Sequence, residues 1–344
     1  MKQTLIPDWV IPASIGLVWP EDLQSSETQT LVNTFFIDLL EVLLEELPGE
    51  VGLTIIHRPG EKQRLINYFG TKRVKLIGDE RIQDIWIRDF APFWKRTEQG
   101  NVPVKGLYLP SYEDVAYQVL SEHDDDAGRR LGGRKTEVLR IDDDEIVLDG
   151  GNLVHNGNGL AIVTNRFISD NEWYFVDKLT EVVKRYLGLD EIILIPSEWG
   201  DDTGHADGVV RFLSEHEVIV SEYPYEWRSN GESIDKIDYL FGKSQLDEIA
   251  FNLKSRGLTV HRMPNGIPVG SEDFEIATGN YTNFLRVGEK FFMPSYEDSL
   301  MNKNAFEALA RAGISEKNII QKLDCTQLAS LGGVLNCIST HIYS

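Results

Sequence analysis

A helix followed by a strand recurs about five times along the 344 residues, and this repetition limits the fold more than any other feature. In each unit, apolar residues at helical spacing precede a short apolar run. The predicted units are 28–47 with 51–56, 61–69 with 74–77, 173–187 with 191–195, 245–255 with 258–262, and 304–312 with 318–320. Repetition of one supersecondary unit predicts a modular α/β architecture in which each unit buries a face against its neighbours.

Two segments between the units are also informative. Residues 152–155 and 160–164 flank the sequence NGNG, which predicts a β-hairpin and therefore mixed sheets. Residues 112–134 contain DDD, RR and GG with little periodicity, and we expect a long surface loop there. Consecutive aspartates lack the alternating ligand spacing of a calcium loop.

The charge balance favours some partners over others. Lys and Arg number 34 against 55 Asp and Glu, which gives a formal net charge of −21. Nucleic acids and anionic membranes are therefore not expected as partners, whereas a small cationic molecule suits this field. Association into a homo-oligomer is compatible with the sequence.

The chain contains two cysteines, no run of about 18 apolar residues and no start typical of a signal peptide. We expect a cytoplasmic protein in a reducing compartment, in which Cys325 and Cys337 are thiols.

Two segments place a histidine or a cysteine among residues that suit catalysis. His205 and Asp207 precede an apolar strand, and in extended backbone residues two apart face the same side, so both can face one cavity. Cys337 follows Gly332 and Gly333, and paired glycines allow close approach or positive φ. A hydrogen bond within a loop and a buried apolar cysteine are the ordinary alternatives.

Two further segments contain a carboxylate beside turn-forming or small residues. The sequence WIRD ends at Asp89, and DGGN begins at Asp149. Taken singly, Asp89 could be a buried partner of Arg88, and Asp149 a helix or turn cap.

Together and in this order, the four segments resemble the agmatine deiminase and bacterial-type peptidylarginine deiminase family of the guanidine-modifying superfamily. That family's pattern runs from Trp-x-Arg-Asp through acid-Gly-Gly-Asn and Gly-His-x-Asp to a Gly-rich cysteine near the C-terminus. IPA at 11–13, VWP at 18–20 and NYTNFL at 280–285 match as well. The resemblance implies one domain over residues 1–344, folded as a five-bladed α/β propeller of the pentein type with mixed sheets around a central active site.

The resemblance also implies roles for individual residues. Cys337 is expected to be the nucleophile, His205 the general acid and base, and Asp89 and Asp207 the ligands of the guanidinium. Asp149 is expected to hold the imidazole. The substrate-binding residues expected from the resemblance are Trp86, Asp149, Asn283 and Asp202.

The implied reaction is hydrolysis of a guanidinium group to a ureido group and ammonia, with agmatine and N-carbamoylputrescine as the first choice of substrate and product. Peptidyl-arginine or free arginine as substrate, and guanidine binding without catalysis, are the alternatives. No metal, nucleotide or redox cofactor is implied. A papain-like hydrolase is disfavoured because its cysteine normally precedes its histidine. A zinc site of His205, Asp207 and Cys337 has suitable ligand types but not the spacing of a zinc motif.

The chain departs from the common family pattern at four positions. Asp149 stands where many relatives have Glu, Phe90 where a small residue is usual, Ala91 where Gly is usual, and Asn336 where His often precedes the cysteine. The last three departures predict a substrate preference that differs from that for agmatine. Asn336 also predicts weak ionisation of Cys337 in the free protein.

Overall fold

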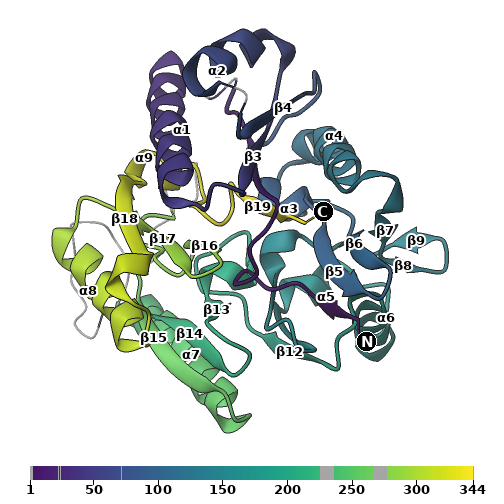
Figure 1. Ribbon diagram of the computed structural model, residues 1–344. Coiled ribbons are helices and arrows are strands. Elements are labelled where there is room, and N and C mark those ends of the chain that lie inside the picture. Colours follow the sequence, from purple (N-terminus) through teal and green to yellow (C-terminus); the bar gives the residue numbers. More distant parts are fainter. Residues whose placement is uncertain are drawn as a thin grey trace.

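The computed structural model describes residues 3–21, 23, 25–70, 72–224, 236–266 and 277–343. Within these ranges the strands form five sheets of three or four strands and one two-stranded sheet. Figure 1 shows the long helices on the outside of the molecule and the strands nearer its middle. None of the helices in the described ranges is long and apolar enough to cross a membrane.

Three of the sheets are built in the same way. Two antiparallel strands are followed by a helix and then by a strand parallel to the second. The sheets are β10 (Leu153–His155), β11 (Leu160–Thr164) and β12 (Glu191–Ile195); β13 (Val210–Phe212), β14 (Glu217–Glu222) and β15 (Thr259–Pro264); and β16 (Leu285–Val287), β17 (Lys290–Ser295) and β18 (Ile319–Asp324). Their crossover helices are α5 (Arg166–Ser169) with α6 (Val176–Leu187), α7 (Lys236–Ser255) and α8 (Ser299–Arg311). A parallel pair needs such a crossover, so the mixed sheets that the sequence predicts are confirmed.

The predicted hairpin is confirmed by β10 and β11, which pair antiparallel. The side chain of Asn156 accepts from the backbone N–H of Asn158 at 2.8 Å and of Leu160 at 3.0 Å. Gly157 and Gly159 have φ of 67° and 92°. The turn therefore depends on an amide acceptor and on glycines at positive φ.

The fourth sheet has the order β1 (Thr4–Leu5), β5 (Phe93–Thr97), β6 (Gly100–Lys105) and β7 (Glu137–Val138). Its crossover is α4 (Val115–Gly132), so the expectation of a surface loop over 112–134 is wrong. Asp114 caps the helix by accepting from Tyr117 N–H at 2.8 Å.

The acidic run within α4 faces mostly inward. Asp124 accepts from the backbone N–H of Gln83, and Asp125 pairs with Lys105 and Arg129. The partners of these buried carboxylates are mostly remote in the sequence. The local sequence therefore gives no sign that these acids are buried, and the run looks like a solvated loop.

The fifth sheet has the order β19 (Thr340–Ile342), β2 (Ser14–Val18), β3 (Gly52–His57) and β4 (Val74–Gly78). Helices α1 (Ser26–Glu46) and α2 (Lys62–Phe69) connect its parallel strands. Strand β19 pairs antiparallel with β2, so the end of the chain completes the sheet that its beginning starts.

The number of predicted units matches the number of larger sheets, but the two do not correspond one to one. The first two units, α1 with β3 and α2 with β4, belong to one sheet. The unit of α4 and β7, which the sequence did not predict, supplies the crossover of another sheet. The number of predicted units equals the number of larger sheets because the extra unit in one sheet offsets the missed unit of α4 and β7 in another.

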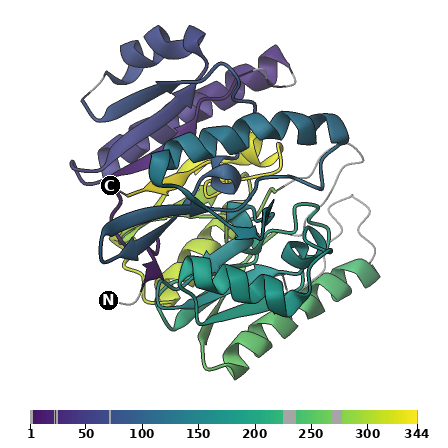
Figure 2. The same cartoon turned by 90° about the vertical axis from the view of Figure 1, so that its right-hand side faces the viewer.

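Smaller elements connect the sheets. They are α3 (Ile87–Phe90), α9 (Thr326–Ala329), the pair β8 (Arg140–Ile141) and β9 (Asp144–Glu145), and 3-10 turns at Pro59–Glu61, Gly133–Lys135, Gly150–Asn152, Ala206–Gly208 and Glu316–Asn318. The largest hydrophobic cluster joins α1, α8 and α9 to β2, β3, β16, β17 and β18. Figure 2 shows α1 and α2 at one end of the molecule and α7 at the other.

Candidate active site

Six of the predicted site residues line one cavity, here called the candidate cavity. They are Trp86, Asp89, His205, Asp207, Asn283 and Cys337. These residues come from α3, the turn Ala206–Gly208 with the residue before it, and the loops before α3, β16 and β19. Residues from four separate parts of the chain therefore meet at one place.

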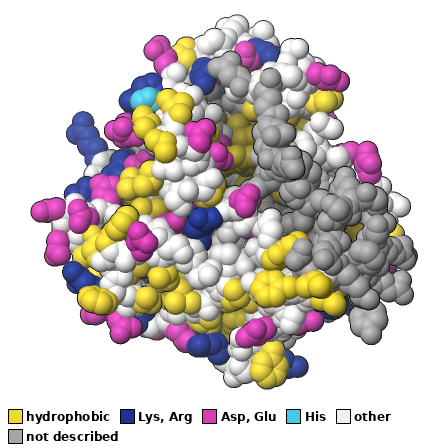
Figure 3. Space-filling model, turned by 180° about the vertical axis from the view of Figure 1, so that it is seen from behind, with side chains coloured by type: hydrophobic (Ala, Val, Ile, Leu, Met, Phe, Trp, Pro, Cys, Tyr) yellow, Lys and Arg dark blue, Asp and Glu magenta, His cyan; other side chains and the backbone are white. Residues whose placement is uncertain are grey.

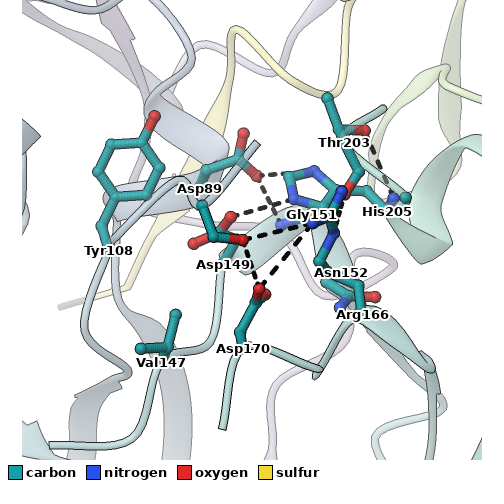
Figure 4. A network of polar contacts seen from close by, with 12 residues as sticks. Asp89, Tyr108, Val147, Asp149, Gly151, Asn152, Arg166, Asp170, Thr203 and His205 are labelled. Atoms are coloured by element: carbon teal, nitrogen blue, oxygen red, sulfur yellow. Dashed lines mark hydrogen bonds and ion pairs between the residues drawn. The ribbon is translucent and has the colours of Figure 1, made fainter. Parts of the chain in front are cut away.

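The imidazole of His205 lies between two carboxylates (Figure 4). Its Nδ1 is 3.5 Å from Oδ1 of Asp89, and its Nε2 is 3.2 Å from Oδ2 of Asp149. Burial disfavours the imidazolium, but Asp89, Asp149 and Asp207 outweigh burial and raise the pKa of His205 to about 10. The histidine is therefore protonated at neutral pH and can donate a proton.

Asp89 is itself buried among acids. Burial, together with the charges of Asp149 and Asp207, raises the pKa of Asp89 even though His205 acts in the opposite direction. Its Oδ1 accepts from the backbone N–H of Gly151 at 2.8 Å. A cation entering the cavity would relieve the cost of holding this carboxylate ionised.

The two glycines after Asp149 are required by close packing. A Cβ at Gly150 would lie 1.9 Å from the carbonyl oxygen of Arg88. A Cβ at Gly151 would lie 2.6 Å from Oδ1 of Asp89 and 2.8 Å from Nδ1 of His205. Any side chain here would therefore separate the acid from the imidazole.

The Gly-Gly pair before Cys337 has two distinct functions. Gly332 has φ of 102°, as the sequence predicts for one such position. A Cβ at Gly333 would lie 2.5 Å from the ring of Trp86. The glycine thus makes room for the indole, and Trp86 borders the cavity rather than the core alone.

Asn283 and Asn336 fix the backbone around Cys337. Oδ1 of Asn283 accepts from the N–H of Asn336 at 3.0 Å and of Cys337 at 3.3 Å, and it lies 3.4 Å from the thiol Sγ. The side-chain amide of Asn336 donates to Oδ2 of Asp207 at 2.6 Å. Asn283 therefore orients the thiol, and Asn336 orients the carboxylate.

The candidate cavity is acidic. No Lys or Arg side chain is among the described residues that line it. Burial raises the pKa of the Cys337 thiol well above its usual value, and the charges of Asp207 and Asp89 raise it further. Figure 3 shows acidic side chains spread among basic and hydrophobic ones on one face of the molecule.

The sequence predicts that His205 and Asp207 face one cavity because both lie in extended backbone. Both residues line the cavity, but this reason is wrong. Residues Ala206–Gly208 form a 3-10 turn rather than a continuation of the extended strand. His205 is extended, with φ of −79° and ψ of 149°, and the turn directs Asp207 into the same cavity.

The other two predicted binding residues do not line the cavity. Asp149 lies against His205, where it holds Nε2 of the imidazole. Asp202 is exposed, while its neighbours Asp201 and Thr203 line the cavity. The backbone carbonyl of Asp202 accepts from Arg166, and Asp202 is not among the described residues that line the cavity.

Phe90 and Ala91 lie outside the cavity. Phe90 is fully buried in a hydrophobic cluster with Ile87, Ala91 and Tyr108, and its ring is 5.7 Å from that of Tyr108. From the sequence, Phe90 could either narrow the site or pack outward beneath it, and the structure shows that it packs outward. These departures from the family pattern therefore do not narrow the described cavity.

The residues at or beside the cavity that the sequence interpretation missed include Tyr112, Arg166 and Glu198. Tyr112 lies edge-on to His205, with ring centroids 5.8 Å apart. Arg166 lies over the Tyr112 ring at 5.4 Å and donates from Nε to the carbonyl of Thr203 at 3.2 Å. Glu198 lines the cavity and is buried. Tyr112 lies in the segment expected to be a loop, and Arg166 and Glu198 have no distinctive local pattern.

No group of three or more His, Cys, Asp or Glu side chains with the geometry of a metal site occurs in the described part of the chain.

Comparisons with known proteins identify the family of the chain and the solved structures that share its fold. A model of the Porphyromonas-type peptidyl-arginine deiminase family matches residues 4–342. A search of curated proteins found no match. Among solved structures, agmatine deiminase of C. jejuni has a TM-score of 0.79 at 18% identity, covering 99% of this chain and 96% of that one. Agmatine deiminase of Enterococcus faecalis has a TM-score of 0.76 at 16% identity, covering 99% and 96%.

At these identities the similarity to solved structures concerns the fold, which is a mixed α/β fold of several sheets shared with deiminases. The family model matches nearly the whole chain. The chain therefore belongs to the Porphyromonas-type peptidyl-arginine deiminase family, whose members are enzymes that hydrolyse C–N bonds of guanidino groups.

Proposed function

We propose that this protein is a cysteine-dependent deiminase that converts agmatine to N-carbamoylputrescine and ammonia. The observation that carries the proposal is the meeting of Cys337, His205, Asp89 and Asp207 in one cavity. A thiol, a protonated imidazole and two carboxylates are the groups that guanidinium hydrolysis requires.

In the proposed reaction, Asp89 and Asp207 bind the planar guanidinium through its N–H donors. The bound cation lowers the cost of ionising the nearby thiol, whose proton passes to solvent, and the thiolate of Cys337 attacks the central carbon. The imidazolium of His205 gives its proton to the departing ammonia as the C–N bond breaks. The product of this step is a covalent thiouronium adduct and a neutral imidazole.

Water then completes the cycle. The neutral imidazole of His205 accepts a proton from the attacking water, and the C–S bond breaks as the ureido group forms. The sulfur leaves as a thiolate, and it takes up the hydroxyl proton that is lost as the ureido carbonyl forms. Asp149, 3.2 Å from Nε2, stabilises the imidazolium that donates its proton in the first half-reaction and forms again in the second.

The charge of the candidate cavity supports a substrate without a carboxylate group. Free arginine and a peptide C-terminal arginine carry a carboxylate, which is usually bound by Arg or Lys. The described lining residues include several carboxylates and no Lys or Arg. Agmatine carries a guanidinium and an ammonium group and no carboxylate.

The strand order supports the remaining part of the proposal, which is a five-bladed propeller formed by residues 1–344 as one domain. Three sheets share the same order, and the other two contain the same unit with one additional strand each. The pairing of β19 with β2 joins the two ends of the chain within one sheet, as closure of a ring of sheets would require.

The test is incubation of the purified protein with agmatine, free arginine and a peptide ending in arginine, with ammonia and the ureido product measured for each. We expect equimolar ammonia and N-carbamoylputrescine from agmatine. Citrulline formed faster than N-carbamoylputrescine would refute the choice of agmatine, and no product from any guanidine would refute the deiminase itself.

A further inference from the structure

Glu198 is a buried carboxylate in the candidate cavity that the proposed chemistry does not use. It lies in the loop after β12, and 5% of its surface is exposed. It lines the same cavity as Cys337 and His205. A substrate whose guanidinium contacts Cys337 can therefore extend toward Glu198 within one continuous space.

The carboxylate is held in a fixed position. The hydroxyl of Tyr223 donates to its Oε1 at 2.8 Å, and Tyr223 is fully buried and stacks on Tyr239. The backbone N–H of Trp199 donates to Gln245 of α7 at 3.0 Å. A Cβ at Gly242 of α7 would lie 2.9 Å from the ring of Tyr223, so the helix packs directly against this support.

Glu198 has no cationic partner within the described residues. No ion pair of Glu198 occurs there, and its charged neighbour is Asp201, which also lines the cavity. A buried ionised carboxylate without a countercharge is costly, and a bound cation would remove that cost. Tyr223 satisfies Oε1, which leaves Oε2 for a ligand.

We propose that Glu198 selects guanidino substrates that carry a second cationic group, by pairing with an ammonium group at the far end of the substrate. This inference rests on the proposed function. It identifies a specificity-determining residue rather than a catalytic one, since the reacting atoms lie at Cys337. A substrate with an uncharged tail would bind without this contact.

The test compares agmatine with pentylguanidine, in which a methyl group stands where agmatine has its ammonium group. In the unmodified protein we expect kcat/KM for agmatine to exceed that for pentylguanidine by about 100-fold, as for a charge-assisted contact in a desolvated site. Glu198→Gln should lower kcat/KM for agmatine by at least about 30-fold and change that for pentylguanidine by less than about 3-fold.

Glu191→Gln is the matched control. Glu191 is at the start of β12, exposed, and paired with Arg256 at 2.7 Å. Its removal should leave the preference for agmatine unchanged. Loss of activity toward both substrates to the same degree in Glu198→Gln would overturn the inference. Hydrolysis of neither guanidine by the unmodified protein would instead refute the proposed function, and the inference with it.

A second variant keeps the test decisive if Glu198→Gln does not fold. Burial and the charge of Asp201 raise the pKa of Glu198 to about 8, while the hydrogen bond from Tyr223 lowers it. The preference for agmatine should therefore increase as the pH rises through about 8. Tyr223→Phe, which keeps the ring, should shift this increase to higher pH. A preference that is independent of pH in both proteins would overturn the inference.

Discussion

Two buried polar regions share the side chain of Asp207 and differ in how their charges are balanced. One is the candidate cavity. The other, here called the basic cluster, contains Asp8, Arg88, His155, Arg211 and His341, which line two adjoining cavities. Each region holds carboxylates close to histidine, but only the basic cluster has arginines among its described lining residues.

The pKa shifts of the carboxylates show the difference. In the basic cluster, burial alone would raise the pKa of Asp8, but His341, Arg211 and Arg88 outweigh it and hold the pKa well below its usual range. Arg211 donates to Oδ2 of Asp8 at 2.7 Å. In the candidate cavity, burial raises the pKa of both Asp89 and Glu198.

The pKa values of the histidines also differ between the two regions, because only His205 lies between two carboxylates. Burial lowers the pKa of His155 and of His341 to about 4, so both are neutral at physiological pH. His205, between two carboxylates, is protonated. We infer that the charges of the basic cluster stabilise the fold, whereas those of the candidate cavity require a ligand to balance them.

The largest expected effect concerns the two cysteines. Cys337→Ala should lower turnover by more than about 1,000-fold, because the proposed nucleophile is removed. The matched control is Cys325→Ala in the hydrophobic core, which should keep turnover and lose about 1 kcal/mol of stability. Ammonia release and thermal unfolding measure the two effects. Substantial turnover by the Cys337→Ala protein would break the assignment of chemistry to the candidate cavity.

The second prediction compares one carboxylate from each region. Asp89→Asn should lower kcat/KM by about 100-fold and change the free energy of unfolding by less than about 1 kcal/mol, because the charge of this acid gains little from its surroundings. Asp8→Asn should keep kcat/KM within about 3-fold and lower the free energy of unfolding by about 2 kcal/mol, since arginines lose their partner. Denaturant unfolding and steady-state kinetics test both variants.

The pH dependence of the free energy of unfolding tests whether the charge of Asp8 stabilises the fold. The pKa of Asp8 is lowered in the folded protein, so its stabilising contribution is fully present above its unfolded value of about 4 and is lost as the pH falls below it. The difference in stability between the unmodified protein and Asp8→Asn should therefore shrink below pH of about 4. A difference that persisted at lower pH would show that the charge of Asp8 is not its cause.

The smallest expected effect concerns arginines that contact aromatic rings. Arg166 holds the segment before His205 and lies over Tyr112. Because Arg166 is a positioning residue, Arg166→Ala should lower kcat by about 10-fold and shift the pH profile of kcat. Arg166→Lys should recover part of the loss. Arg185→Ala is the control, because Arg185 lies over Tyr186 at 5.8 Å on the exposed side of α6. Equal effects of Arg166→Ala and Arg185→Ala would refute a positioning role.

Local patterns in the sequence predicted several elements correctly. The spacing of apolar residues predicted α1, α2 and α6 to within about three residues, and the NGNG turn predicted the hairpin of β10 and β11. These features depend on neighbours one to four residues apart, so the sequence displays them directly. The family pattern likewise gave six of the residues that line the candidate cavity.

The prediction failed where distant residues decide the environment. Helix α4 was not predicted because Asp124 and Asp125 resemble solvated acids until Gln83, Lys105 and Arg129 surround them. The direction of Phe90 and the exposure of Asp202 depend in the same way on packing between elements.

The sequence by itself determined which kinds of groups are present, their order along the chain and the local turns that display them. Only the tertiary structure decided which carboxylates have a countercharge. Asp8 is partly buried and Glu198 is buried, yet Arg211, 203 residues along the chain from Asp8, compensates one, and the described residues leave the other without a cation. The energy of a buried charge is set by what surrounds it in space, and one-dimensional spacing does not contain that information.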